Sequence, residues 1–362
     1  MDCDFYRICF LIFSLSIVGL AVWDRGSSRR GAGVAFILTG LFYLASIVRQ
    51  VGINSDTISY AKHAEVAAKI TLSCYLDSSR FEPINGVLLW SFSNLGWSPE
   101  LSYFSFIALA FVGLNAMLWS MLSDRYLLFV AITYPQFGLI EPLSTLRWGL
   151  ALNVLAVAYL TIRKYPFVLR SPGYVAVGAL HFAVMPAAGI ASLRDWRIQV
   201  GLTSAFVAIL LWYLPSVGLE SGTGMRYGVA LLASLGLMLA SEAKLRDDGY
   251  YQHLAIIGCS VIVSLLFIKS PHYIRFAVPF LWISYVPLCM FWRRAGVSRT
   301  AIMILMIVPA LALANEVRRN TCEVWSGDRS SNVRSQESAA NEAYGLMFGK
   351  RDQHTLCAPE LG

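Results

Sequence analysis

The sequence predicts an all-α, polytopic integral membrane helix bundle, and three observations favour this fold class. Of the 362 residues, 57% are hydrophobic and only 14% are charged, whereas a soluble domain carries about 25% charged residues. The mean hydropathy of the chain is +0.58. Its apolar residues gather into stretches of roughly the 20 residues that a helix needs to cross a bilayer. We therefore expect about 11 to 13 transmembrane segments.

The apolar stretches follow one another along residues 1–315, which we predict to be one transmembrane domain. The first stretch, Ile8–Trp23, resembles a signal peptide in length, but a basic flank follows it instead of a small-residue cleavage site, so we interpret it as a retained helix. A shorter apolar run, 84–97, is a candidate re-entrant helix. The predicted spans lie near 5–23, 32–48, 100–122, 125–143, 147–163, 165–181, 182–193, 198–214, 226–241, 253–268, 275–293 and 299–315.

Short basic connections separate several of these spans and predict the orientation of the bundle. Lys and Arg favour the cytoplasmic side of a membrane protein, so the net charge of +7 reflects topology and not a nucleic-acid-binding surface. The opposite ends then face outward, together with the long loop 49–81 and its amphipathic helix, provided that 84–97 does not cross. The basic connections are Asp24–Arg30, Arg163–Arg170, Arg194–Arg197, Ser241–Asp248 and Arg293–Arg299.

The tail and the cysteines indicate no further catalytic domain. Residues 316–362 are polar and mixed in charge, and we expect them to be weakly ordered. The seven cysteines show no metal-ligand spacing; we expect most of them to be inert packing residues, although Cys322 and Cys357 can pair if the tail is extracytoplasmic. The sequence has no Walker A, GxSxG, HExxH or Rossmann motif, so we expect no metal, nucleotide or other cofactor.

Arg147 is the most unusual charged residue of the predicted outer side. It follows Glu141-Pro142 and begins an apolar span that Ser144 or Thr145 can cap. A cation at the positive end of a helix dipole is unfavourable and indicates a nearby anion. The alternatives are a salt bridge to Glu141 or a side chain that extends to the membrane surface.

A second arginine occupies a similar position. Arg275 follows His272 in a short turn and begins another apolar span. Two arginines at outer helix starts favour an anionic ligand such as a diphosphate, because guanidinium groups bind phosphate oxygens through paired hydrogen bonds. His272 is a lesser candidate ligand.

Three acid or base candidates accompany the arginines. Glu82-Pro83 opens the run 84–97, where Glu82 is either a ligand or a simple helix-terminal charge. His181 lies at a predicted outer helix break. Asp56, Tyr60 and His63 recur at helical spacing on one face of the outer helix. The alternative for Asp56 is a helix cap, and we expect His63 to lie on a solvated face.

The order of these residues resembles the EpsG-type family, which belongs with the Wzy-like polymerases of bacterial O-antigen, capsule and exopolysaccharide assembly. The resemblance covers about residues 50–290. Trp148 replaces the Gln of the family's Arg-Gln pair, and its Phe-His pair is reversed as His181-Phe182. The matching positions are Asp56 with Tyr60, Glu82-Pro83, Arg147 followed by Gly149-Leu-Ala151, His181 and Arg275.

The resemblance implies a glycosyltransferase of the bacterial cytoplasmic membrane that joins undecaprenyl-diphosphate-linked oligosaccharide units on its outer face. The implied partners are this lipid-linked substrate, membrane lipid and a chain-length regulator protein, without nucleic acid. Arg147 and Arg275 would bind the diphosphate, and the candidates for the base are Glu82, then His181, then Asp56. The remaining substrate-binding candidates are Tyr60, Glu141 and His272.

Two other functions fit parts of the pattern. A lipid-linked glycan flippase or secondary transporter would explain broken helices and charges within spans, but it predicts inverted repeats that the sequence does not show. A membrane glycan acyltransferase would need an essential His with a second polar partner, and His181 is the one indication of it.

Overall fold

The computed structural model describes residues 3–24, 28–47, 55–79, 81–95, 98–137, 146–162, 165–213, 248–268 and 274–291. These residues form helices joined by short turns, with no strand among them, so the all-α class is confirmed. The helices are α1 (Cys3–Trp23), α2 (Arg29–Ile47), α3 (Ser55–Ala67), α4 (Leu72–Ser78), α5 (Pro83–Ser93), α6 (Pro99–Leu122), η1 (Ser123–Arg125), α7 (Tyr126–Phe137), α9 (Leu146–Ile162), α10 (Phe167–Leu180), η2 (Phe182–Val184), α11 (Met185–Ser192), α12 (Trp196–Tyr213), α14 (Asp248–Ser264), η3 (Leu265–Ile268) and α15 (Ile274–Phe291).

Every predicted span that falls in the described part of the chain is helical. The spans predicted at 226–241 and 299–315 and the tail 316–362 lie outside it. By length and apolarity, two segments of the described part qualify as membrane spans, Leu101–Tyr134 and Trp196–Tyr213. Shorter apolar helical segments are Leu11–Trp23, Arg147–Ile162, Phe182–Ser192, Leu254–Val263 and Phe276–Pro287. The predicted re-entrant run is α5, whose 11 residues extend only about 16 Å.

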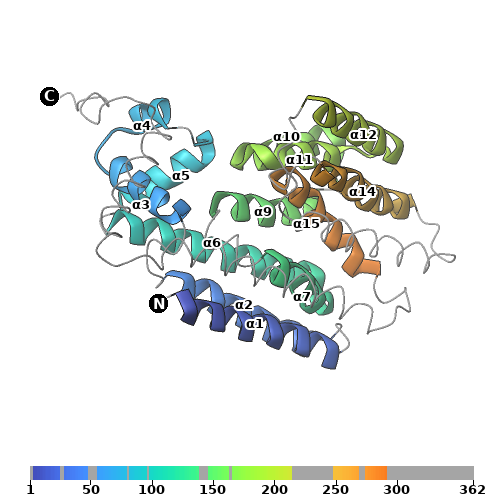
Figure 1. Ribbon diagram of the computed structural model, residues 1–362, viewed down its shortest axis with the longest axis horizontal. Coiled ribbons are helices and arrows are strands. Elements are labelled where there is room, and N and C mark those ends of the chain that lie inside the picture. The colour runs from blue at the N-terminus through green and yellow to red at the C-terminus, as the bar shows by residue number, and fades with distance from the viewer. Residues whose placement is uncertain are drawn as a thin grey trace.

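The helices lie side by side, and their connections gather at two ends (Figure 1). One end, here called the basic end, contains the α1–α2 connection, η1 and the connections before α10 and α12. There α2 contacts η1, and Arg194 donates a hydrogen bond to the carbonyl oxygen of Tyr165 (3.3 Å). The other end, here called the site end, contains α3, α4, α5, the start of α9 and the end of α10. The predicted separation from Arg147 is therefore present for the basic residues described at 29–30, 170 and 194–197. The basic connections predicted at 241–248 and 293–299 fall almost entirely outside the described part.

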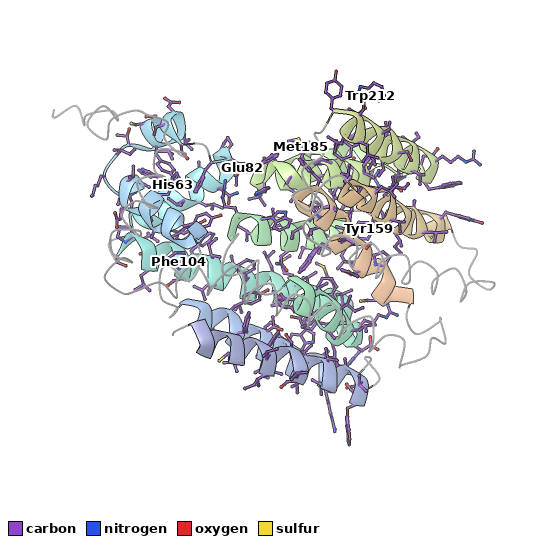
Figure 2. All side chains as sticks on the ribbon, viewed as in Figure 1. His63, Glu82, Phe104, Tyr159, Met185 and Trp212 are labelled. Carbon is purple, nitrogen blue, oxygen red and sulfur yellow. The ribbon has the colours of Figure 1, made fainter. Side chains whose placement is uncertain are left out.

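Helices α2 and α12 bury polar side chains and expose apolar ones. In α2, Thr39 is fully buried, while Ile37 and Leu41 are 60% and 59% exposed. In α12, Thr203 is fully buried, while Trp212 is 87% exposed and points away from the bundle (Figure 2). This distribution is the reverse of that of a soluble helix, which turns its apolar stripe to the interior.

A buried polar network joins α2, α6 and α7. Asn115 Oδ1 accepts hydrogen bonds from the hydroxyls of Tyr126 and Tyr134, both at 2.9 Å. Its Nδ2 donates to the carbonyl oxygen of Phe111 (2.8 Å), and Tyr43 donates to the hydroxyl of Tyr134. One amide thus satisfies polar groups of α6 and α7, and Tyr134 extends the network to α2 within an apolar interior.

We expect Asn115→Leu to lower the melting temperature of the detergent-solubilised protein by several degrees. The substitution leaves the hydroxyls of Tyr126 and Tyr134 without their acceptor, and each buried unsatisfied group costs about 1–3 kcal/mol. The control is Asn94→Leu at the exposed end of α5, which should have a smaller effect. Equal melting temperatures for the wild type and Asn115→Leu would contradict a stabilising role of the network.

Candidate functional site

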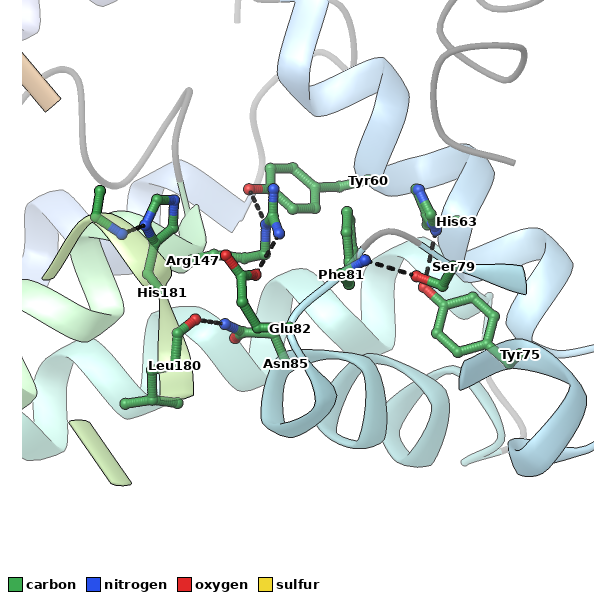
Figure 3. Close-up of polar contacts among 11 residues, drawn as sticks. Tyr60, His63, Tyr75, Ser79, Phe81, Glu82, Asn85, Arg147, Leu180 and His181 are labelled. Carbon is green, nitrogen blue, oxygen red and sulfur yellow. Dashed lines mark hydrogen bonds and ion pairs between the residues drawn. The ribbon is translucent and has the colours of Figure 1, made fainter. Parts of the chain in front are cut away.

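Arg147 is the centre of a cluster at the site end. Its Nη1 lies 2.5 Å from Oε2 of Glu82, and its Nε donates to the hydroxyl of Tyr60 at 3.2 Å (Figure 3). The Arg147 and Glu82 side chains retain 22% and 15% exposure. Within the described part of the chain, no acceptor contacts Nη2 of Arg147. This partly exposed guanidinium therefore keeps N–H groups for an additional oxygen ligand.

Glu82 neutralises Arg147 in place of capping its own helix. It is the N-cap residue of α5, with Pro83 in the first turn, but its side chain makes no capping hydrogen bond. The carboxylate contacts Arg147 instead, at the start of α9. This anion offsets the unfavourable position of a cation at a helix N-terminus. The sequence-based alternative for Arg147, a salt bridge to Glu141, involves a residue outside the described part.

Phe81 and His63 form a stack behind the guanidinium. Cζ of Arg147 lies 4.0 Å from the ring centroid of Phe81, and the rings of Phe81 and His63 are stacked with centroids 4.0 Å apart. Figure 3 shows Phe81 between the two side chains. Nδ1 of His63 is hydrogen-bonded to the hydroxyl of Tyr75 at 2.8 Å. The stack thus joins α3, α4 and α9 through the residue that precedes Glu82.

The prediction that His63 lies on a solvated face is wrong. His63 is fully buried and Tyr60 is 4% exposed, because α3 packs against α5 and α6 instead of lying free in the outer loop. Burial, with a smaller contribution from the charge of Arg147, lowers the pKa of His63 from 6.5 to about 3. Burial also raises the pKa of Tyr75, so its hydroxyl keeps its proton. His63 is therefore neutral at physiological pH and unsuited to act as a general base.

We expect the stability of the protein to fall as the pH is lowered from about 7 to about 4. The folded-state pKa of His63 is below its unfolded value, so the unfolded chain binds more protons between pH 6.5 and about 3. The contribution of His63 to stability is full above pH 6.5 and decreases through this window. Among the described residues, Tyr75 is hydrogen-bonded to it and Arg147 acts on it by charge. Melting temperatures of the wild type should decrease more steeply with acidification than those of His63→Phe, and parallel slopes would contradict the neutral buried histidine.

A second polar contact brings His181 to the same end. The side-chain amide of Asn85 in α5 donates a hydrogen bond to the carbonyl oxygen of Leu180, the last residue of α10. His181 follows in an extended conformation, and its Nδ1 accepts a hydrogen bond from the backbone N–H of Ala183 at 3.2 Å. The proton of the neutral imidazole is then on Nε2. His181 is therefore better placed to donate a hydrogen bond than to accept a proton.

The start of α15 lies beside His181. The ring of Phe182 packs edge-on against Phe276, with centroids 6.3 Å apart. Arg275 precedes Phe276 and lies in the first turn of α15, but its side chain is outside the described part of the structure, like that of Asp56 in α3. Glu141 and His272 also fall outside it.

The structure therefore brings together Tyr60, Glu82 and Arg147 directly, with His181 nearby. Sequence reasoning missed Phe81, Tyr75 and Asn85 as parts of this arrangement. Asn85 had a detectable signal, since an amide inside an apolar run requires a hydrogen-bond partner. Phe81 and Tyr75 had none, because an aromatic residue is common in any helical core. Among the described residues, no three His, Cys, Asp or Glu side chains gather as a metal site would require.

Cys74 at the site end differs from the other described cysteines. We expected most cysteines to be inert packing residues, and Cys74 in α4 is an exception because it is disulfide-bonded. Cys9, Cys259 and Cys289 are free, so the partner of Cys74 lies outside the described side chains. Cys322 and Cys357, the pair predicted in the tail, are also outside them.

Comparisons of the chain with protein-family models, curated proteins and solved structures gave no match. The fold and the site define an all-helical protein with a partly exposed, ion-paired arginine at one end of the bundle. Its function must be argued from these residues.

Proposed function

We propose that this chain is a multi-pass membrane glycosyltransferase that joins lipid-diphosphate-linked oligosaccharide units into a polysaccharide. The proposed site of action is the outer face of the bacterial cytoplasmic membrane, with undecaprenyl diphosphate as the lipid carrier. The single observation that carries the proposal is the environment of Arg147. This guanidinium is partly exposed and held by Glu82 and Tyr60, and within the described residues its Nη2 has no acceptor, at the end opposite the described basic connections.

The exposed apolar faces of α2 and α12 support the membrane location. Side chains at positions 34, 37, 41 and 44 of α2 form one exposed apolar stripe, and only 17% of the apolar window of α12 is buried. A soluble monomer rarely exposes contiguous apolar surface on this scale. Lipid chains would cover these faces without further protein contacts. Helices too short to span the bilayer alone, such as α10 and α11, would cross it packed against neighbouring helices.

Two features support an outer location for the site. Lys and Arg of short connections favour the cytoplasm, and the described basic connections lie at the far end of the bundle from Arg147. Disulfides persist mainly in oxidising compartments, and Cys74 is disulfide-bonded at the site end. The polysaccharide would accordingly be assembled outside the cytoplasm, where no nucleotide-activated sugar is required.

The proposed reaction transfers a glycosyl group between two lipid-linked chains. A hydroxyl oxygen of one unit attacks the anomeric carbon of the growing chain, and the bond from this carbon to the diphosphate oxygen breaks. The electron pair leaves with the lipid diphosphate, whose charge Arg147 stabilises together with Arg275. Glu82 is our first candidate to take the hydroxyl proton, because the lone pair of His181 Nδ1 is already engaged.

A deletion strain tests the proposal against the transporter and acyltransferase alternatives. We expect loss of the ladder of polymer chain lengths, with single repeat units still attached to the lipid carrier and exposed at the surface. Loss of all surface glycan would indicate a transporter. An unchanged ladder with a missing acyl substituent would indicate an acyltransferase, and either result would contradict the proposal.

A further inference from the structure

We propose that Phe81 and His63 are positioning residues that orient the guanidinium of Arg147 toward the diphosphate of the lipid-linked substrate. This inference rests on the proposed function for the identity of the ligand. The orientation itself depends on contacts within the described residues. It assigns a role to Phe81, which sequence reasoning missed, and to His63, which was expected on a solvated face.

Two hydrogen bonds alone do not determine the plane of the Arg147 guanidinium. Tyr60 contacts Nε and Glu82 contacts Nη1, the two nitrogens on either side of Nη2. The face of Phe81, with Cζ at 4.0 Å from its centroid, adds a cation–π contact that restrains the plane. Arg147 also lies 5.8 Å from the ring centroid of Tyr60. The N–H groups of Nη2 are then held in a single direction instead of several.

Phe81 is in turn held from its other side and along its backbone. His63 stacks on the ring with an interplanar angle of 22°, and Ser79 Oγ accepts a hydrogen bond from the backbone N–H of Phe81 at 3.0 Å. The hydrogen bond to Tyr75 prevents rotation of the imidazole. A neutral ring is required in this position, because an imidazolium would repel the nearby Arg147 charge across one aromatic layer.

The central test compares Phe81→Leu with Phe81→Tyr. Leucine fills the same apolar space but has no aromatic face, whereas tyrosine keeps it. We expect purified full-length Phe81→Leu to bind inorganic pyrophosphate roughly 2- to 30-fold more weakly than the wild type, from the usual range of cation–π contributions. Phe81→Tyr should restore binding. The matched control is Phe92→Leu, since Phe92 is also partly buried and stacked, on Phe106, but is not in contact with Arg147.

A second readout reports the orientation of Arg147 without any ligand. The rate at which phenylglyoxal modifies Arg147, followed by mass spectrometry, should rise at least 2-fold in Phe81→Leu and His63→Ala and stay unchanged in His63→Phe. A merely structural role would instead lower the melting temperature of Phe81→Leu and Phe92→Leu alike, with pyrophosphate affinity and Arg147 modification unaltered.

The two readouts separate failure of the inference from failure of the proposed function. If pyrophosphate binding and Arg147 modification are the same in Phe81→Leu and wild type, the positioning role is overturned. Suppose instead that Arg147 modification changes as expected, but the wild type and Arg147→Ala bind pyrophosphate equally. The positioning role then stands and the diphosphate site is overturned.

Discussion

Replacing Arg147 with alanine is expected to abolish long-chain polymer and to leave single repeat units on the lipid carrier. The guanidinium stabilises the charge that develops on the departing diphosphate, and removal of one such donor lowers a rate by about 10²–10³. Long chains require many successive transfers, so only the shortest products would then remain. The measurement is the chain-length distribution of the surface glycan in a strain that expresses the variant at the wild-type level.

Two companion variants define the result for Arg147. Arg147→Lys keeps the charge but cannot contact Tyr60 and Glu82 through one planar group, so we expect shorter chains and not a complete loss. Arg197→Ala is the matched control, since Arg197 is exposed at the basic end of the bundle. A normal ladder in Arg147→Ala would contradict the assignment of the site.

Glu82→Gln is expected to slow unit joining by about 10²–10⁴, the usual contribution of a general base. The amide keeps the shape of the side chain but removes the proton acceptor and the anion that neutralises Arg147. Glu82→Asp retains the charge with a shorter reach, so its rate should lie between those of Glu82→Gln and the wild type. The rate is measured with purified protein and lipid-linked units.

The control for Glu82 is Glu65→Gln in α3, another partly buried glutamate of the site end. It should leave the rate within about 2-fold of the wild type, because the described contacts of Arg147 are with Tyr60, Phe81 and Glu82 and do not include Glu65. A wild-type rate in Glu82→Gln would exclude Glu82 as the base and as a necessary partner of Arg147. If Glu82→Asp is as slow as Glu82→Gln, the exact position of the carboxylate, and not its charge alone, is essential.

The helices of the bundle were predictable because their signal is local. Apolar stretches bounded by Pro, Gly or charged residues predict helices such as α6 and α12, and basic connections predict which helix ends lie together. Arg147 was identifiable for a similar reason, since a cation at a helix N-terminus within apolar sequence requires an anion. The described helices coincide with these apolar stretches, although only two described segments are long and apolar enough to span a membrane.

The partners within the site were not predictable, because they come from distant parts of the chain. The sequence offered Glu141 as the nearest carboxylate to Arg147, but the structure brings Glu82, at the N-terminus of α5, into contact with it. The burial of His63 likewise depends on α3 packing against α5 and α6. Helical periodicity alone gives the face on which a side chain lies, but it does not reveal whether another helix covers that face.

The most direct test of the central claim uses purified protein in liposomes with synthetic lipid-diphosphate-linked repeat units. The proposal predicts oligomers of increasing length, with one lipid diphosphate released for each new glycosidic bond, and no product with Arg147→Ala. Transfer of intact units across the bilayer without joining, or oligomer formation by Arg147→Ala at the wild-type rate, would contradict it.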